Sequence, residues 1–527
     1  MSNTAHGSAD VVVIGSGING LVAAALLARG GKKVVVLERN AAPGGAMWTS
    51  TEHVDGFTIE LLSSWHPLFV GGPAYADLAD DLARHGLEYR NTPLPTGVVC
   101  AEGAAFLSTD LEVTSAEMAR LGDLDNWNAL MADFGSKADL AFGLLGTDFW
   151  RRNAWKFGWK AYRQLGRRGL MASGADLLEP AAPWADRTFS SPITKALLAP
   201  WALHNGLGPD DSGSAFITTV IAAAVAMGGM PIPVGGGRSL VNALVSIVEE
   251  HGGDVRTECD VTEIMTTGER ATGVRLASGD VVLASTAVLA SVTPPALYSR
   301  LLANSAPERR AAAERFRFGR AGMQIHIALD EPPQWQGDER LADTALVHVL
   351  DGMDSLSESV NAANRGYLPR RPTIVVGQPA TIDPGRVPPG KGLLWIQLQE
   401  NPRHVVGDLA GTIDPGDGTW SARLRDEYAE RVIGHLEPHI TNIRSAELAR
   451  VVIGPADLEA MNVNLDGGDP YAGDCRIDQY ALWRPLATAT GHDTGFSNVW
   501  HIGASTHPGP GLGGGSGYQV ATRLLGK

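Results

Sequence analysis

A glycine-rich turn between an apolar strand and a helix constrains this chain more than any other feature. Residues 11–14 read Val-Val-Val-Ile and lead directly into Gly-Ser-Gly-Ile-Asn-Gly at 15–20. An Ala- and Leu-rich helix is predicted over 21–29, and a second apolar strand over 34–37. Strands that are apolar on both faces are typical of a parallel sheet covered by helices on each side. The sequence therefore predicts an α/β fold that begins with a Rossmann-like β–α–β unit.

The small residues of this turn have separate tasks in binding a dinucleotide. Gly15 allows the tight turn, Gly17 lets the backbone approach a pyrophosphate, and Gly20 lets the helix pack closely on the strand. The helix N-terminus offers free N–H groups and a positive dipole end to the phosphates. We expect Ser16 and Asn19, within the same turn, to belong to this cofactor site.

An acid and a second glycine pair follow this unit. Glu38 lies 23 residues after the first glycine of the turn, where its carboxylate can accept hydrogen bonds from ribose hydroxyls. Because the carboxylate would repel a 2′-phosphate, NADP is disfavoured. The pair Gly44-Gly45 is typical of a class of FAD enzymes in which the chain passes beside the cofactor a second time. We therefore expect Arg39, Gly44, Gly45 and Ala46 to line an FAD site.

A second glycine-rich segment lies near the C-terminus, between a predicted strand over 499–503 and a predicted helix over 514–525. It lacks a downstream acid, so it is not a second nucleotide fold. The N–H groups at the start of its helix could stabilise negative charge near the pyrimidine side of a reduced flavin. The further candidate cofactor contacts are Gly503, Gly513, Gly514, Gly515 and, at the start of another predicted strand, Val261.

Taken together, these segments resemble the phytoene desaturase (carotenoid desaturase) family of FAD-dependent oxidoreductases, in particular its phytoene-dehydrogenase-like branch. The matching motifs lie within 15–24, 38–39, 44–45, 56–57, 234–240, 271–279 and 503–517. The resemblance implies a discontinuous Rossmann-like FAD-binding domain formed by 9–60, 231–315 and 486–527. It also implies an inserted α+β substrate-binding domain formed by 61–230 and 316–485.

The resemblance implies a dehydrogenase or desaturase that transfers hydride from an apolar organic substrate to FAD, with oxygen or a quinone as the final electron acceptor. With a single nucleotide fingerprint, no resident NAD(P)H site is expected. Ala46 stands where many members carry Arg, so one cationic contact near the cofactor is missing. Three alternatives stay open, namely a flavin amine oxidase, a flavin-dependent isomerase or saturase, and a non-catalytic flavoprotein scaffold.

Histidines are the candidate proton acceptors. His66 soon follows the segment expected to flank the flavin, and His507 lies in the C-terminal glycine loop. Both are predicted as catalytic residues, with a hydrogen-bonded structural role as the alternative. His326 lies in a predicted strand over 323–330 whose alternation indicates half-burial, so it could face the substrate.

Overall charge and cysteine content limit the partners. With 43 basic against 58 acidic residues the net charge is −15, which disfavours nucleic-acid binding. The 3 cysteines lie far apart, with no zinc spacing, so neither a metal site nor a disulfide framework is expected. No secretory signal pattern opens the chain, and the apolar stretch 215–227 is too short to cross a membrane. A cytoplasmic location is expected, and the oligomeric state stays open.

One segment reverses the acidic character. Residues 150–168 carry 7 Lys and Arg residues and no acid, interleaved with aromatic residues. As a helix, this segment would suit an anionic membrane surface, from which a desaturase-like enzyme would draw a lipid-like substrate. The sequence thus predicts peripheral membrane contact through 150–168, in a helical membrane- or lid-like part near 145–170. The alternative is a solvated helix whose aromatic side chains pack on the core.

Overall fold

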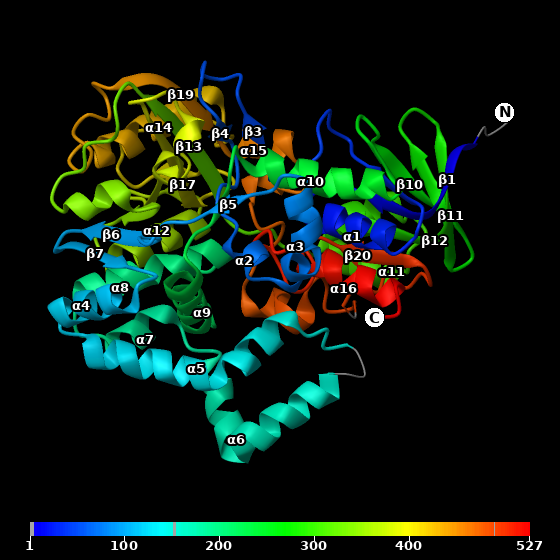
Figure 1. The fold of residues 1–527 in the computed structure, drawn as a ribbon, viewed down its shortest axis with the longest axis horizontal. Coiled ribbons are helices and arrows are strands. Elements are labelled where there is room, and N and C mark those ends of the chain that lie inside the picture. The colour runs from blue at the N-terminus through cyan, green and yellow to red at the C-terminus, as the bar shows by residue number, and fades with distance from the viewer. Residues whose placement is uncertain (1–4, 151–153, 490) are drawn as a thin grey trace.

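Two large sheets of seven strands each organise the described part of the chain, residues 5–150, 154–489 and 491–527 of a computed structural model. In Figure 1 the sheet that contains β1 lies on the right, near both termini, and the sheet that contains β13 lies on the left. This arrangement confirms the mixed α/β class that the sequence predicts.

The first sheet has the order β10-β11-β12-β1-β2-β9, and β20 pairs with β12. Its central pairings, β12 with β1 and β1 with β2, are parallel. The strands are β1 (Ala5–Ile14), β2 (Val34–Leu37), β9 (Asp254–Arg256), β10 (Val261–Thr267), β11 (Arg270–Leu276), β12 (Val281–Ser291) and β20 (Val499–Ile502). They fall within the ranges predicted for the FAD-binding domain, except that β1 begins at Ala5 and thus before residue 9.

Helices cover both faces of the centre of this sheet, which explains the wholly apolar segments 11–14 of β1 and 34–37 of β2. Val11 and Val13 pack in one cluster with α1 (Ile18–Arg29), α10 (Gly237–Glu250) and α16 (Gly515–Leu524). Val12 and Ile14 point the opposite way, into a second cluster that includes side chains of η2 (Ala296–Leu301) and α11 (Pro307–Glu314). Because successive strand residues alternate between faces, both sets must be apolar.

The second sheet has the order β19-β13-β17-β16-β14-β6-β7 and is antiparallel except for the β14–β6 pair. Its strands are β6 (Thr96–Cys100), β7 (Gly103–Leu107), β13 (Ala321–Leu329), β14 (Leu346–Val349), β16 (Ile374–Gly377), β17 (Gly392–Asn401) and β19 (Glu447–Ile453). They fall within the ranges predicted for the substrate-binding domain.

The two faces of this second sheet differ in character. Leu394, Ile396 and Leu398 pack in one apolar cluster with α14 (Ala422–Leu436). The alternate residues of the same strands face the interior of the molecule, and they include Gln324, His326, His348, Trp395, Gln397 and Gln399. A polar inner face on an otherwise apolar sheet indicates where a site can lie.

The helices between residues 67 and 84 pack with α1 and α10 beside the first sheet, and those between residues 111 and 228 lie below the second sheet in Figure 1. They are α2 (Pro67–Val70), α3 (Pro73–Arg84), α4 (Leu111–Leu121), α5 (Leu124–Gly146), α6 (Ala154–Asp176), α7 (Ala181–Thr188), α8 (Pro192–Leu198), η1 (Ala199–Asn205) and α9 (Ser214–Gly228). The short strands β3 (Thr49–Ser50) and β5 (Tyr89–Arg90) pair with β4 (Ile59–Glu60) and β8 (Ile232–Pro233). Among the described helices, none combines the length and apolar character that crossing a membrane requires.

Candidate functional site

The N-terminal glycine turn is closely packed at two positions and open at the third. A Cβ added to Gly20 would lie 2.1 Å from the carbonyl oxygen of Gly15, so helix α1 starts directly against the turn. A Cβ on Gly15, whose φ is +90°, would lie 3.1 Å from the carbonyl oxygen of Ser291. A Cβ on Gly17, the N-cap of α1, would meet nothing within 4 Å. The free space therefore lies where a pyrophosphate is expected.

Glu38 ties the two N-terminal glycine segments together. The backbone N–H and the hydroxyl of Ser16 donate to its Oε2 at 3.0 and 2.6 Å, and the N–H of Asn40 donates to its Oε1 at 2.9 Å. The N–H of Gly44 donates to the Ser16 hydroxyl at 3.2 Å. A carboxylate can accept about four hydrogen bonds, so Glu38 keeps capacity for a ribose hydroxyl. Arg39 is exposed beside it.

The second pass of the chain touches the first. Gly45 adopts φ +63°, and a Cβ there would lie 2.8 Å from the Cα of Gly17. The carbonyl of Ala46 accepts a hydrogen bond from the Ser63 N–H at 3.2 Å. This leads the chain from the glycine pair toward the strands and loops that precede His66. Gly45 and Ala46 thus lie beside the same space as Gly17.

The C-terminal glycine loop closes against the N-terminal one. The N–H of Gly517 donates to Asn19 Oδ1 at 3.2 Å, and a Cβ on Gly517 would lie 1.9 Å from the Asn19 carbonyl oxygen. Gly514, the N-cap of α16 with φ +68°, packs against Val22 of α1. The first turns of α1 and α16 are therefore in contact. Both expose N–H groups at the same end.

The other predicted residues of this loop lie close by. Gly503 donates its N–H to the Ser516 hydroxyl at 3.1 Å. Gly513 faces the backbone of Leu68, and Gly515 faces Pro508. In contrast, the Val261 side chain is buried in the sheet core with Ile14 and Leu37, so only its backbone remains for cofactor contact.

One residue that no sequence motif marks completes this region. Asn464 Nδ2 donates to the Ser291 carbonyl at 3.2 Å, and this is the same carbonyl that lies nearest to Gly15. Asn464 Oδ1 is buried and has no hydrogen-bond partner. No local signal could have found Asn464, because it reaches the turn only through the fold. Its orphaned acceptor fits a polar group of a bound cofactor.

The donors that converge here fit FAD. The open space beside Gly17 and two helix N-termini suit a pyrophosphate and an electron-rich ring. The orphaned Asn464 Oδ1 adds an acceptor on the same side.

His66 is buried at the start of α2 and is 1% exposed. Its Nδ1 shares a hydrogen bond of 3.0 Å with the Tyr89 hydroxyl, and its Nε2 is buried without a partner. Burial, together with the positive charge of Arg386, lowers the pKa of His66 to about 3. His66 is therefore a neutral imidazole with one uncommitted nitrogen, as the predicted proton acceptor requires.

His507 is also neutral and poorly partnered. Both of its ring nitrogens are buried without hydrogen-bond partners, and its ring meets that of Phe149 edge-on at a centroid distance of 5.7 Å. Burial and the charge of His492 lower the pKa of His507 to about 4. It lies in the loop that ends at α16.

His326 departs from the expectation of half-burial. Every residue of β13 is buried, because α14 covers one face and the segment around Leu61 covers the other. His326 Nε2 lies 3.3 Å from the Leu61 carbonyl, and its Nδ1 has no partner. Burial lowers its pKa to about 4.

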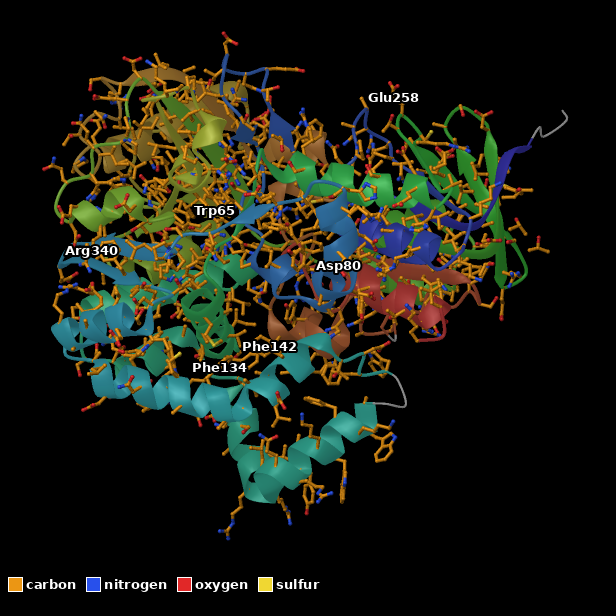
Figure 2. All side chains as sticks on the ribbon, viewed as in Figure 1. Trp65, Asp80, Phe134, Phe142, Glu258 and Arg340 are labelled. Carbon is orange, nitrogen blue, oxygen red and sulfur yellow. The ribbon has the colours of Figure 1, made fainter. Side chains whose placement is uncertain are left out.

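The polar inner face of the second sheet contains a histidine pair that the sequence did not indicate. His204 Nε2 and His348 Nε2 lie 2.9 Å apart, and Trp201 lies against both rings. Burial lowers the pKa of each histidine, to about 3 for His204. Trp65 and Trp395 meet edge-on at 5.0 Å in the same interior, and Figure 2 shows Trp65 between the two sheets.

Comparison with known proteins shows which family this chain belongs to. The family described as flavin containing amine oxidoreductase matches residues 18–437. The protein "Pyridine nucleotide-disulfide oxidoreductase domain-containing protein 2" of Rattus norvegicus is 27% identical, over 97% of this chain and 92% of its own.

Two further relatives have names that state an activity. A limonene dehydrogenase component of Castellaniella defragrans is 23% identical over 97% of this chain and 93% of its own. The lycopene-forming phytoene desaturase of Pseudescherichia vulneris is 25% identical over 98% of both chains. The resemblance to carotenoid desaturases that the motifs predicted is thus confirmed.

Solved structures share the fold. Putrescine oxidase bound to putrescine superposes with a TM-score of 0.60 at 15% identity, covering 99% of both chains. This likeness confirms the Rossmann-like architecture, and FAD is the cofactor that the family and the donor set indicate together.

Replacing Gly17 tests the open space directly. We expect Gly17→Ala to weaken FAD binding at least about tenfold, or about 1.4 kcal/mol, because its methyl group would fill the phosphate space. The apoprotein should keep its unfolding midpoint, since that Cβ meets no protein atom. Flavin retention and thermal unfolding of apoprotein measure the two effects.

Two glycines serve as controls. Gly517→Ala should lower the stability of the apoprotein by about 1–3 kcal/mol, because its Cβ would overlap the Asn19 carbonyl. Gly135→Ala, exposed in α5 with nothing within 4 Å, should leave FAD affinity unchanged and raise the stability of the apoprotein by about 1 kcal/mol, because alanine favours a helix interior over glycine. Unaltered FAD affinity in Gly17→Ala would contradict the assignment.

Proposed function

Because the chain belongs to the flavin containing amine oxidoreductase family and is an FAD-dependent oxidoreductase, we propose that it removes a hydride from an uncharged, largely apolar organic substrate. The observation that carries this proposal is the neutral, aromatic interior between the inner face of the second sheet and the helices η1 and α9. The histidines there are held uncharged by burial, beside Trp65, Trp201 and Trp395. An uncharged substrate loses little hydration on entering such surroundings.

In this proposal, cofactor binding and substrate binding are assigned to the two predicted domains. The ranges 9–60, 231–315 and 486–527 supply the cofactor residues except Asn464, which comes from the range 316–485, and the inner face of the second sheet supplies the substrate side. The placement of each sheet's strands within these ranges supports this division.

The residues of this chain bind, orient and accept a proton. The N-termini of α1 and α16 hold the cofactor by their N–H groups, and Glu38 holds the ribose. When bound, FAD supplies the acceptor for a hydride from a substrate C–H bond. His507 and His66 each offer a neutral nitrogen that can accept the proton lost from the neighbouring carbon. Oxygen or a quinone then takes the electrons.

The relatives support an apolar substrate. One is named as a phytoene desaturase and another as part of a limonene dehydrogenase. Both substrate names denote hydrocarbons of terpenoid type, so an unfunctionalised C–H bond is the proposed point of attack.

Amine oxidation is the second candidate, and the fold shared with putrescine oxidase favours it. A substrate ammonium group would call for a free carboxylate, yet the deeply buried acids have structural partners. Asp469 accepts hydrogen bonds from three backbone N–H groups, and Glu400 accepts one from the N–H of Thr373. Glu60 Oε1 accepts a hydrogen bond from the Thr49 hydroxyl while its Oε2 makes none, but burial raises the pKa of this carboxyl group and so favours its uncharged form. The hydrocarbon substrate therefore fits this interior better.

Anaerobic flavin bleaching tests the proposed reaction. Purified holoprotein is mixed with terpenoid hydrocarbons, primary and secondary amines, and matched saturated hydrocarbons, while the visible absorbance of the oxidised flavin is followed. We expect bleaching with an unsaturated apolar compound and recovery of colour on admission of air or a quinone. Bleaching by amines alone would identify an amine oxidase, and turnover without acceptor reduction an isomerase. A flavin that no compound reduces would indicate a scaffold.

The pH profile tests the neutral histidines. His507 has its pKa lowered to about 4 and His66 to about 3, so each is an unprotonated acceptor above these values. The rate of flavin reduction should therefore stay constant from about pH 8 to pH 5 and fall only as the pH approaches about 4. His507→Gln should slow reduction about 100-fold or more if its nitrogen takes the proton. An inflection near the ordinary histidine pKa of about 6.5 would contradict the buried, neutral state.

We also propose that α6 contacts a membrane surface. Trp155 and Trp159 are 65% and 55% exposed, and Lys156 and Arg163 are exposed on the same helical segment. Arg167 is exposed just beyond a non-helical break at Gly166, whose φ is +66°. Helix α6 projects from the body at the bottom of Figure 1, and its side chains point into solvent in Figure 2. Aromatic and basic groups side by side suit an anionic lipid surface. Of the residues predicted for this contact, Arg151 and Arg152 lie outside the described residues.

Vesicle co-sedimentation measures this contact. Lys156→Gln, Arg163→Gln and Arg167→Gln in combination should lower binding to phosphatidylserine vesicles about tenfold or more at low salt, at about 1 kcal/mol per charge. A matched charge change on another surface, Arg365→Gln with Arg423→Gln and Arg444→Gln, should leave binding within about twofold. Equal binding by both triple variants would show that α6 is a solvated helix.

A further inference from the structure

A cavity of about 270 Å³ lies apart from the histidine-lined interior. It opens between the end of η1 at Gly206, the start of β13, the end of α12 (Met353–Asn364) and the segment after β17. The lining residues that matter are Arg320, Asn401, Arg403, His404, Asp474 and Arg476. Its volume is slightly below that of ordinary small-molecule sites, about 300–1,000 Å³, so it suits a small ligand.

The guanidinium of Arg320 has no anion to balance it. Its terminal nitrogens donate to Asn364 Oδ1 at 3.3 Å and to the Gly206 carbonyl at 3.0 Å. Among the described residues, no carboxylate forms an ion pair with this group. Its Nε is buried and has no acceptor. A buried donor of a cation is costly to leave unpaired, so an external acceptor is expected.

The other cations of the cavity already have acidic partners. Arg476 pairs with Asp474 at 2.6 Å, and Arg403 pairs with Asp466. Among the described wall residues, Arg320 is thus the arginine without an ion pair. The nearby Glu400 is buried, which raises its pKa against the opposing effect of the Arg320 charge. A singly charged anion matches the single charge of Arg320 better than a phosphate dianion.

Asn401 supplies the complementary acceptor. Its side chain is buried, and its Nδ2 donates to the Ala321 and Leu398 carbonyls at 3.3 and 3.4 Å. These two bonds fix the amide orientation and leave Oδ1 without a donor. Asn401 pairs in register with Ala321, the residue next to Arg320, so Asn401 and Arg320 lie at the same end of two neighbouring strands, and both line the cavity.

We propose that this cavity binds a small organic carboxylate that carries a hydroxyl group, with the carboxylate paired to Arg320 and the hydroxyl donating to Asn401 Oδ1. The planar guanidinium edge suits a carboxylate, and charge-assisted bonds of this kind are about twice as strong as neutral ones. The ligand satisfies both orphaned groups at once. This site goes beyond the proposed oxidoreductase reaction and does not depend on it.

The cavity lies close behind the C-terminal glycine loop. Gly206, in its wall, follows Asn205, whose Oδ1 accepts a hydrogen bond from the Tyr480 hydroxyl at 3.4 Å. The same hydroxyl lies 3.2 Å from the Pro508 carbonyl. Tyr471 also packs against Gly206 and separates the cavity from the inner face of the sheet. A ligand here would therefore occupy a site of its own.

Calorimetric titration of the oxidised holoprotein with lactate, propionate and inorganic phosphate tests the proposal. We expect lactate to bind more tightly than propionate and phosphate to bind more weakly than either. Arg320→Gln should weaken lactate at least about tenfold, while Arg365→Gln, an exposed arginine outside the cavity, should leave it unchanged. Asn401→Leu should abolish the preference for lactate over propionate. Flavin content and melting temperature confirm that each variant is folded.

Three outcomes would overturn the proposal. These are the absence of lactate binding, lactate binding that Arg320→Gln leaves unaltered, and preferred binding of phosphate. Because the titration involves no turnover, its failure leaves the bleaching experiment unaffected, and the reverse also holds.

Discussion

The contact between the first turns of α1 and α16 is the constraint on which the site depends. Asn19 and Gly517 lie 498 positions apart, yet a side chain as small as a methyl group on Gly517 would overlap the Asn19 carbonyl. The contact brings two positive helix ends together, and like dipole ends repel one another. A pyrophosphate and an electron-rich flavin bound at the proposed site would offset that repulsion. Cofactor binding and the closure of the two chain ends would therefore stabilise each other.

The two faces of the second sheet have different roles, because one belongs to the apolar core and the other carries polar side chains. Its outer face is apolar and sealed by α14, so the strands are held by ordinary core packing. Its inner face carries histidines and glutamines that no helix of the core could satisfy. Burial removes the charge of these histidines by lowering their pKa values. The histidines of this interior are therefore polar but uncharged, which is what the proposed oxidation of an apolar substrate would need.

Local pattern predicted the frame of the cofactor site well. The apolar run at 11–14, the glycine turn and Glu38 correspond to β1, α1 and the end of β2 because each is fixed by nearest neighbours in sequence. The predictions that failed concern features that depend on residues distant in the sequence. The sequence did not indicate Asn464, because only the fold brings it to Ser291. The sequence predicted half-burial for β13, which is fully buried, because alternation cannot reveal what covers the polar face of a strand.

Two departures from the acidic character of the chain have different physical consequences. The cations of α6 are exposed, numerous and beside aromatic rings. The free energy of the proposed membrane binding would therefore come from many weak, salt-sensitive contacts with an extended surface. Arg320 is a single guanidinium with a buried Nε, and the Gly206 carbonyl and Asn364 fix its position. The free energy of the proposed anion binding would therefore come from one oriented contact that salt screens poorly. An extended array suits a lipid surface whose headgroups can rearrange, whereas a fixed fork suits one small molecule of matching shape. The extent to which these basic side chains are buried would thus decide whether they bind an extended surface or one small molecule.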